Sequence, residues 1–219
     1  MPCVPRGSCY FRRAMATVGP FELPLDGIEA VIFDCDGTLV NSMPAHFEAW
    51  CEALSYYGAA NVFQEDVFYA MGGRPTMDIV VDLNADYGLK LDPDAVAMKK
   101  REAYLQRLHQ IELIEEVVEH ARRLRGKLPM AIATGGTRMV IEKTLQAVGV
   151  SDLFDEVATA EDVANGKPAP DIFLYAAKLL GVAPEKCLVL EDAPAGIMAA
   201  QLAGMTVVSI PAPLDLAPS

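Results

Sequence analysis

The sequence predicts an α/β protein in which a Rossmann-like, doubly wound parallel sheet forms the core and an α-helical cap is inserted into it. Two observations predict the core. Apolar runs recur without polar alternation, as in strands buried on both faces of a sheet, and amphipathic helical patterns lie between them. A third observation predicts the cap, because residues 42–112 are helical in pattern and contain no convincing buried strand.

The apolar runs supply the strands in chain order. Residues 29–33 read EAVIF, and residues 128–133 read LPMAIA. Residues 187–190 (CLVL) and 205–210 (MTVVSI) predict two further strands, and residues 156–158 predict a shorter one. Right-handed crossovers between such strands bring their carboxyl ends to one edge of the sheet, where ligands bind in open parallel sheets.

Apolar residues spaced three and four apart predict amphipathic helices between the strands. One such helix opens the cap around Trp50, and residues 140–148 and 172–180 form two more in the core. Glycine or proline interrupts the cap at residues 72–73, 88 and 93.

The last cap helix is predicted to be long. Its apolar positions are Val96, Met98, Tyr104, Leu105 and Leu108. The charged residues 99–102 interrupt this pattern, and we expect their basic cluster to be a solvated helix face.

These patterns divide the chain into three parts. Residues 1–25 are an extension outside the fold, which we expect to be disordered; residues 26–41 and 113–219 form the core, and residues 42–112 form the cap. The first 20 residues contain three arginines and no apolar stretch long enough for a secretory signal. A disordered extension, or a start codon assigned upstream of Met15, is therefore favoured over an organellar transit peptide.

The composition restricts the partners. The 219 residues include 18 basic and 30 acidic side chains, giving a formal charge of −12, which argues against nucleic acid or an anionic membrane as the main partner. No run approaches the roughly 18 apolar residues of a membrane span. The five cysteines are odd in number and lack CxxC spacing, which favours free thiols in a reducing compartment. We therefore expect a soluble, cytoplasmic protein.

Two carboxylates stand where the first strand ends. Asp34 and Asp36 belong to the run DCDGT, which directly follows the apolar residues of that strand. Carboxylates two residues apart repel one another unless a cation or a shared proton compensates, and a hard divalent ion is the natural compensation. A loop in which Asp36 and Gly37 form a turn is the alternative. The pattern becomes specific only with polar residues at the other strand ends.

Such residues follow later in the chain. Thr134 closes the second strand and precedes two glycines, and Lys167 stands between a glycine and a proline just ahead of a helix. Glu191 and Asp192 end the strand at 187–190. Alone, the threonine is more often a helix N-cap and the lysine more often a solvated side chain. Adjacent acids after a buried strand are harder to explain by solvation.

Taken in order, these motifs resemble those of the haloacid dehalogenase superfamily of phosphotransferases, over about residues 26–210. The segments FDCDGTLVNS, HFEAW, GKPAPDIF and LEDAPAGIMAA are similar to the subgroup that contains β-phosphoglucomutase and small sugar-phosphate phosphatases, fructose-1-phosphate phosphatase-like proteins among them. That subgroup carries its helical cap where residues 42–112 are inserted.

The resemblance implies a role for each motif residue. Asp34 is expected to be the nucleophile that forms an aspartyl-phosphate, and Asp36 the general acid and base. Thr134 and Lys167 are expected to offset charge on the phosphoryl group. The implied cofactor is Mg²⁺, with ligands from Asp34, Asp36, Glu191 and Asp192. Substrate contacts are expected from Thr38, His46, Arg74 and Gly135, with packing of the first cap helix as the alternative role of His46.

The expected function is Mg²⁺-dependent hydrolysis of a small phosphorylated sugar similar to fructose 1-phosphate, by a monomer. The main alternative is a β-phosphoglucomutase-type transfer. Mutases of the subgroup carry basic residues on both sides of a cap turn where this chain has Met71 and Pro75, which favours hydrolysis. A binding protein that has lost its chemistry is the least favoured alternative, because all the core motif residues are present.

Overall fold

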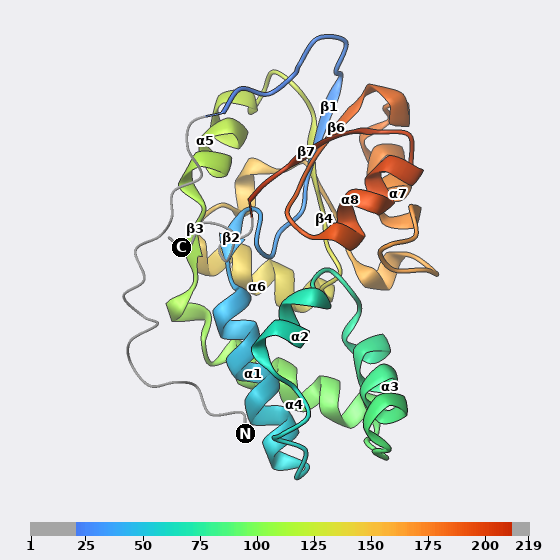
Figure 1. Ribbon diagram of the computed structural model, residues 1–219. Coiled ribbons are helices and arrows are strands. Elements are labelled where there is room, and N and C mark those ends of the chain that lie inside the picture. Colours follow the sequence, from blue (N-terminus) through green and yellow to red (C-terminus); the bar gives the residue numbers. More distant parts are fainter. Residues whose placement is uncertain (1–20, 212–219) are drawn as a thin grey trace, which may run out of the picture.

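The computed structural model describes residues 21–211, so the predicted extension lies almost entirely outside the described residues. Its core is a five-stranded sheet in the order β5-β4-β1-β6-β7, with every neighbouring pair parallel (Figure 1). The predicted α/β fold with a parallel sheet is confirmed. The strands are β1 (Ala30–Phe33), β4 (Met130–Ala133), β5 (Glu156–Ala158), β6 (Cys187–Glu191) and β7 (Thr206–Ser209).

The sheet is covered on both faces, as the unalternating apolar runs predict. Val31 and Phe33 of β1 belong to one apolar cluster, and Ala30 and Ile32 belong to another, because successive side chains of a strand point to opposite faces. Helices α5 (Glu115–Leu124) and α6 (Arg138–Val148) pack in the first cluster. Helices α7 (Asp171–Leu180) and α8 (Pro194–Leu202) pack in the second, on the right in Figure 1.

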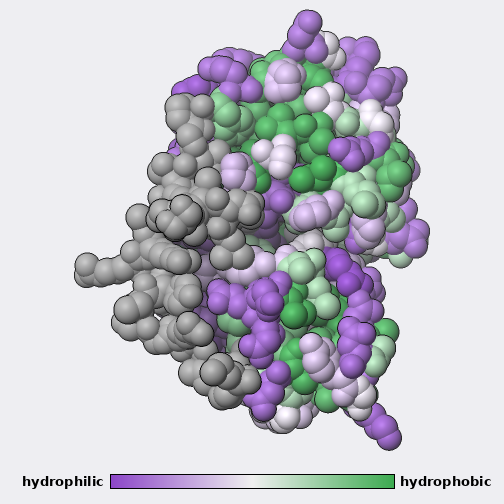
Figure 2. Space-filling model, viewed as in Figure 1, coloured by the Kyte–Doolittle hydropathy of each residue, from purple (hydrophilic) through white to green (hydrophobic). Residues whose placement is uncertain are grey.

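The predicted cap segment holds four helices that lie below the carboxyl ends of the strands in Figure 1. They are α1 (Met43–Tyr56), α2 (Glu65–Ala70), α3 (Thr76–Tyr87) and α4 (Pro93–Leu105). They share a separate apolar cluster around Trp50 and Phe63. Figure 2 shows a waist between the sheet-bearing part and this helical part of the surface.

The breaks inside the cap have local causes. Helix α3 ends at Gly88, whose φ of 64° lies in the left-handed region that glycine adopts without strain. Helix α4 starts at a proline, and the carboxylate of Asp92 caps it by accepting a hydrogen bond of 3.0 Å from the Asp94 N–H. Helix α4 ends at Leu105, short of the predicted Leu108, which lies in a separate 3₁₀ turn.

A two-stranded antiparallel pair, which the sequence did not predict, stands at the two ends of the cap segment. It consists of β2 (Val40–Asn41) and β3 (Glu112–Leu113). Strands of two residues are too short to show the alternation by which strands are recognised. The pair brings the two connections of the cap side by side, and the predicted division at residues 42 and 112 remains a prediction.

Within the described part of the chain, no helix is long and apolar enough to cross a membrane. Cys35 and Cys187 are buried free thiols, as predicted. Cys51 is disulfide-bonded, so the prediction of free thiols is wrong for this residue. Spacing along the chain carries no signal for such a bond, because a disulfide depends on the distance between two Cα atoms in the fold.

Candidate active site

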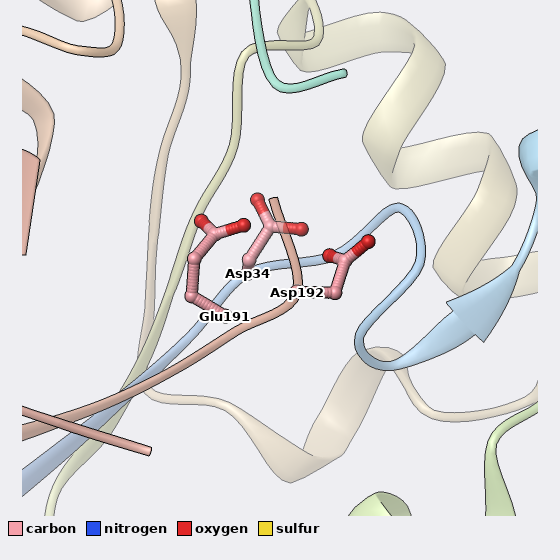
Figure 3. Close-up of side chains that lie close together, drawn as sticks. All are labelled: Asp34, Glu191 and Asp192. Carbon is pink, nitrogen blue, oxygen red and sulfur yellow. The ribbon is translucent and has the colours of Figure 1, made fainter. Parts of the chain in front are cut away.

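Three carboxylates meet at the carboxyl edge of the sheet. Asp34 follows β1, Glu191 ends β6 and Asp192 follows it, and one oxygen from each lies within 4.8 Å of the others. Figure 3 shows the three side chains beside one another at the ends of these strands. Since β1 is the strand at which the sheet order reverses, this is the crevice where open α/β sheets bind their ligands.

The backbone brings these acids together through strand pairing and two glycines. Phe33 and Leu190 are register partners, and the Asp34 N–H donates to the Leu190 carbonyl at 2.9 Å. Gly37 has a φ of 94°, and a Cβ there would overlap the Asp192 carboxylate. A Cβ at Gly196 would likewise overlap the Glu191 carboxylate. The glycines of the motifs thus leave space for the acids.

Lys167 is buried among these acids, not solvated. Its Nζ donates to Asp34 Oδ1 at 2.5 Å, to Glu191 Oε2 at 2.7 Å and to the carbonyl of Ala133 at 3.2 Å. The three hydrogens of an ammonium are all used by these three acceptors. Lys167 is only 3% exposed, so its charge acts in a medium where water screens little.

The local charge favours a divalent cation. Three carboxylates lie around one lysine. Burial and then the charge of Glu191 raise the pKa of Asp34 well above its usual value, and the same two causes raise the pKa of Asp192 to about 7. Burial alone would lower the pKa of Lys167, but Asp34 and Glu191 raise it. The residues present therefore fit a hard ion with oxygen ligands, such as Mg²⁺.

Asp36 lies next to this cluster and is held from the cap side. Its Oδ1 accepts a hydrogen bond of 2.5 Å from the Ser42 hydroxyl and one of 3.0 Å from Nε2 of His46. Burial alone would raise the pKa of Asp36, but the neighbouring His46 and these two bonds lower it to about 2. His46 is therefore in contact with the predicted acid and base. The buried Ser42, which sequence reasoning missed, gave no signal beyond its place six residues after Asp36.

The remaining core residues lie around the same edge. Thr38 is buried and donates to Asp192 Oδ1 at 2.9 Å. Thr134, at the end of β4, accepts from the Gly136 N–H at 3.1 Å and lines one pocket with Lys167 and Gly135. Because Thr134 accepts that bond, its hydroxyl hydrogen is available to a ligand oxygen.

The cap loop that precedes α3 closes over this edge. A Cβ at Gly135 would lie 2.8 Å from the Gly73 carbonyl oxygen, and a Cβ at Gly166 would lie 2.5 Å from Pro75. A Cβ at Gly73 would stand 3.7 Å from Lys167. The cap loop and the core edge therefore approach each other closely at Gly73, Gly135 and Gly166, because glycine has no side chain to keep them apart.

Arg74 is the predicted site residue that the structure does not bring to the acids. Its guanidinium pairs with Asp82 of α3 at 2.7 Å, and both side chains are partly exposed. Within residues 21–211, the Arg74 side chain makes no other hydrogen bond or ion pair. A contact between Arg74 and substrate remains a prediction.

Lys100 corrects the prediction of a solvated basic face. It is half-buried on α4, with Nζ 3.5 Å from the Thr76 hydroxyl and 5.5 Å from the centre of the Trp50 indole. Burial lowers the pKa of Lys100 to about 8, against the opposing effect of the Asp36 charge. The signal was present in the sequence, because Lys100 lies four residues from both Val96 and Tyr104, which are buried on one helix face.

Fold and site together define a doubly wound α/β protein in which an acidic edge that could hold a cation and a buried lysine lie next to a helical segment. A family model described as haloacid dehalogenase-like hydrolase matches residues 28–204, and the chain belongs to this family.

Known proteins of this family are similar over most of their length. Fructose-1-phosphate phosphatase YqaB of Escherichia coli is 39% identical over 186 residues, which cover 82% of this chain and 95% of the relative. A hydrolase from Pseudomonas syringae has a TM-score of 0.76 and 30% identity, and the match covers 83% of this chain and 84% of the hydrolase chain. A β-phosphoglucomutase from Clostridium difficile has a TM-score of 0.71 and 27% identity, and the match covers 83% of this chain and 84% of the mutase chain.

Proposed function

We propose that this haloacid dehalogenase-family phosphomonoester hydrolase cleaves a small phosphorylated sugar, with fructose 1-phosphate as the first candidate, using Mg²⁺ and an aspartyl-phosphate intermediate at Asp34. The observation that carries the proposal is the burial of Lys167 between Asp34 and Glu191 at the carboxyl edge of the sheet. The similarity to a fructose-1-phosphate phosphatase supports the substrate class.

In the first half of the reaction, a carboxylate oxygen of Asp34 attacks phosphorus and the bond from phosphorus to the sugar oxygen breaks. Because His46 and Ser42 hold the pKa of Asp36 at about 2, Asp36 first takes up a proton from solvent as the substrate binds, and it then gives this proton to the leaving sugar oxygen. In the second half, Asp36 takes a proton from water as the water oxygen attacks phosphorus, which releases inorganic phosphate and frees Asp34. The same carboxyl group thus serves as acid and then as base.

The other residues offset charge and hold geometry. Lys167 pairs with Asp34 and faces the phosphoryl oxygens, and Thr134 donates its free hydroxyl hydrogen to one of them. Glu191 holds Lys167 in place. Oxygens of Asp34, Asp36 and Asp192 would hold Mg²⁺, which supplies positive charge against the phosphoryl group when bound.

The cap provides the contacts that select the sugar. His46 and Lys100 lie over Asp36, so we assign them to the sugar side of the site, with Thr38 and Gly135 on the phosphate side. Closure of the cap excludes water during transfer, and reopening admits it for the second half.

The test is phosphate release from sugar phosphates, nucleotides and phosphoglycolate, with Mg²⁺ and with a chelator. We expect the highest kcat/KM for a hexose monophosphate, no turnover without metal, and a loss of at least about 1000-fold in Asp34→Asn. Asp78→Asn, which changes an exposed cap acid, is the matched control. If beryllium fluoride with Mg²⁺ forms no adduct at Asp34 and no substrate is cleaved, the protein only binds its ligand.

The similarity to a β-phosphoglucomutase makes phosphoryl transfer between two sugar positions the second candidate. Incubation with β-glucose 1-phosphate and a trace of the bisphosphate separates the two functions. Free phosphate indicates a hydrolase, which we expect, whereas glucose 6-phosphate indicates a mutase.

A further inference from the structure

Two buried rings stack against each other where the cap meets the core. The imidazole of His46 on α1 and the phenol of Tyr104 on α4 are 4.0 Å apart between centroids and inclined by only 6°. Tyr104 is 1% exposed and His46 is 9% exposed. A close parallel contact of this kind restricts rotation of both rings.

The Tyr104 ring is fixed from the core side. Its hydroxyl lies 3.0 Å from the hydroxyl of Thr144 on α6, and the Thr144 hydroxyl donates to the Val140 carbonyl at 3.0 Å. Because Thr144 has a single hydroxyl hydrogen and uses it there, Tyr104 is the donor to Thr144. The phenol is thus tied to a core helix, while its ring face covers a residue of the cap.

His46 has few other restraints. Nε2 bonds to Asp36 at 3.0 Å, whereas no hydrogen-bond partner of Nδ1 exists among residues 21–211. The ring plane that aims Nε2 at Asp36 is therefore set by the stack with Tyr104. Ser42 holds the same oxygen of Asp36 and also interacts with the Tyr104 hydroxyl, so Tyr104 is linked to Asp36 on this side as well.

We propose that Tyr104 is a positioning residue for the acid and base of the reaction, acting through the His46 ring on the Asp36 carboxylate. This inference rests on the proposed function, in which Asp36 protonates the departing sugar oxygen. The chain of contacts runs from Thr144 in the core through Tyr104 and His46 to Asp36, so the contact of His46 with the acid depends on docking of α4 against α6. A sugar phosphate bound under an open cap then meets an acid that is not yet aimed.

The leaving group distinguishes this role from a structural one. A sugar alkoxide needs a proton as it leaves, whereas nitrophenolate is a stable anion and leaves without one. The ratio kcat/KM reports the steps up to departure of the first product, so it omits the later hydrolysis of the aspartyl-phosphate. Loss of positioning therefore lowers kcat/KM for the sugar phosphate and spares p-nitrophenyl phosphate.

The test compares Tyr104→Leu with wild type on fructose 1-phosphate and p-nitrophenyl phosphate, in the presence of Mg²⁺. We expect kcat/KM to fall about 10-fold or more for the sugar phosphate, a fraction of the 10² to 10⁴ that general acid catalysis supplies, and less than about twofold for the nitrophenyl ester. Tyr104→Phe, which keeps the ring and loses the bond to Thr144, should show the same pattern at about three- to fivefold, and it carries the test if Tyr104→Leu does not fold.

Phe63→Leu is the matched control, because it removes another fully buried cap ring, which meets Trp50 at a tilt and Phe68 edge-on and makes no ring contact with His46. We expect it to change both substrates by the same factor. Equal losses on both substrates in the Tyr104 variants overturn the inference and leave the proposed function intact. If wild type cleaves neither ester, the proposed function itself fails.

Discussion

Lys100→Met exchanges a half-buried charge for an apolar side chain of similar length, and the structure sets the size of the effect. Burial lowers the pKa of Lys100 from 10.5 to about 8. At roughly 1.4 kcal/mol for a pKa change of one, keeping this ammonium charged in the folded protein costs about 3 kcal/mol at neutral pH. Loss of the contact with the Trp50 indole subtracts about 1 kcal/mol from the gain. The variant should therefore be more stable than wild type by about 2 kcal/mol, while its KM for a sugar phosphate rises about 10-fold.

The pH dependence provides a second check. Below pH 8 the lysine is protonated in both the folded and the unfolded protein, so the full difference in unfolding free energy is present. As pH rises through about 8 toward 10.5, the folded protein releases this proton before the unfolded one, wild type gains stability, and the difference between wild type and variant closes.

Thermal denaturation at several pH values, with steady-state kinetics at neutral pH, measures both effects. For a protein of this size, 2 kcal/mol corresponds to roughly 4 to 8 °C in Tm. Lys99→Met is the control, because Lys99 pairs with Glu102 on the surface of α4, and we expect neither a gain in Tm nor a change in KM. A Lys100→Met variant that melts below wild type at neutral pH would refute the burial argument, and an unchanged KM would refute the placement of Lys100 over the substrate.

Three further predictions concern the core. Lys167→Ala should weaken binding of inorganic phosphate more than binding of Mg²⁺ in paired titrations, because Lys167 faces the phosphoryl group, and equal losses would contradict that role. Gly135→Ala should lower kcat about 10-fold or more with little change in Tm, because its Cβ would lie 2.8 Å from the Gly73 carbonyl and hold the cap open; an unchanged kcat would exclude this contact from closure. Without metal, the pKa of Asp192 is about 7 in the folded protein instead of 3.8, so the free energy of unfolding falls as pH rises between these values. Mg²⁺ should therefore raise Tm more at about pH 8 than at about pH 5.5. Equal gains in Tm at the two pH values would argue against Asp192 as a ligand.

The core site could be predicted because the positions at which the strands end can be read from the apolar runs of the sequence. Apolar runs in the sequence predict β1, β4 and β6, and the parallel pairing expected of such strands places Asp34, Thr134 and Glu191 on one edge of the sheet. The structure places Lys167 between the acids, where neither periodicity nor composition could put it. That position depends on a loop, whose path is not fixed by a repeating pattern.

The cap was predictable as helices but not as a set of contacts. A helix turns by about 100° per residue, so the face on which a side chain lies follows from which neighbours are buried. The apolar pattern of α4 included Met98, which is 52% exposed, and that choice hid the face formed by Val96, Lys100 and Tyr104. Packing of α4 against α1 and α6 decides which side chains of α4 are buried, and this packing is a property of the whole fold. The proposed substrate contacts of His46 and Lys100 therefore lie in the part of the molecule where local sequence carries the least information, and the Tyr104 and Lys100 variants address that part directly.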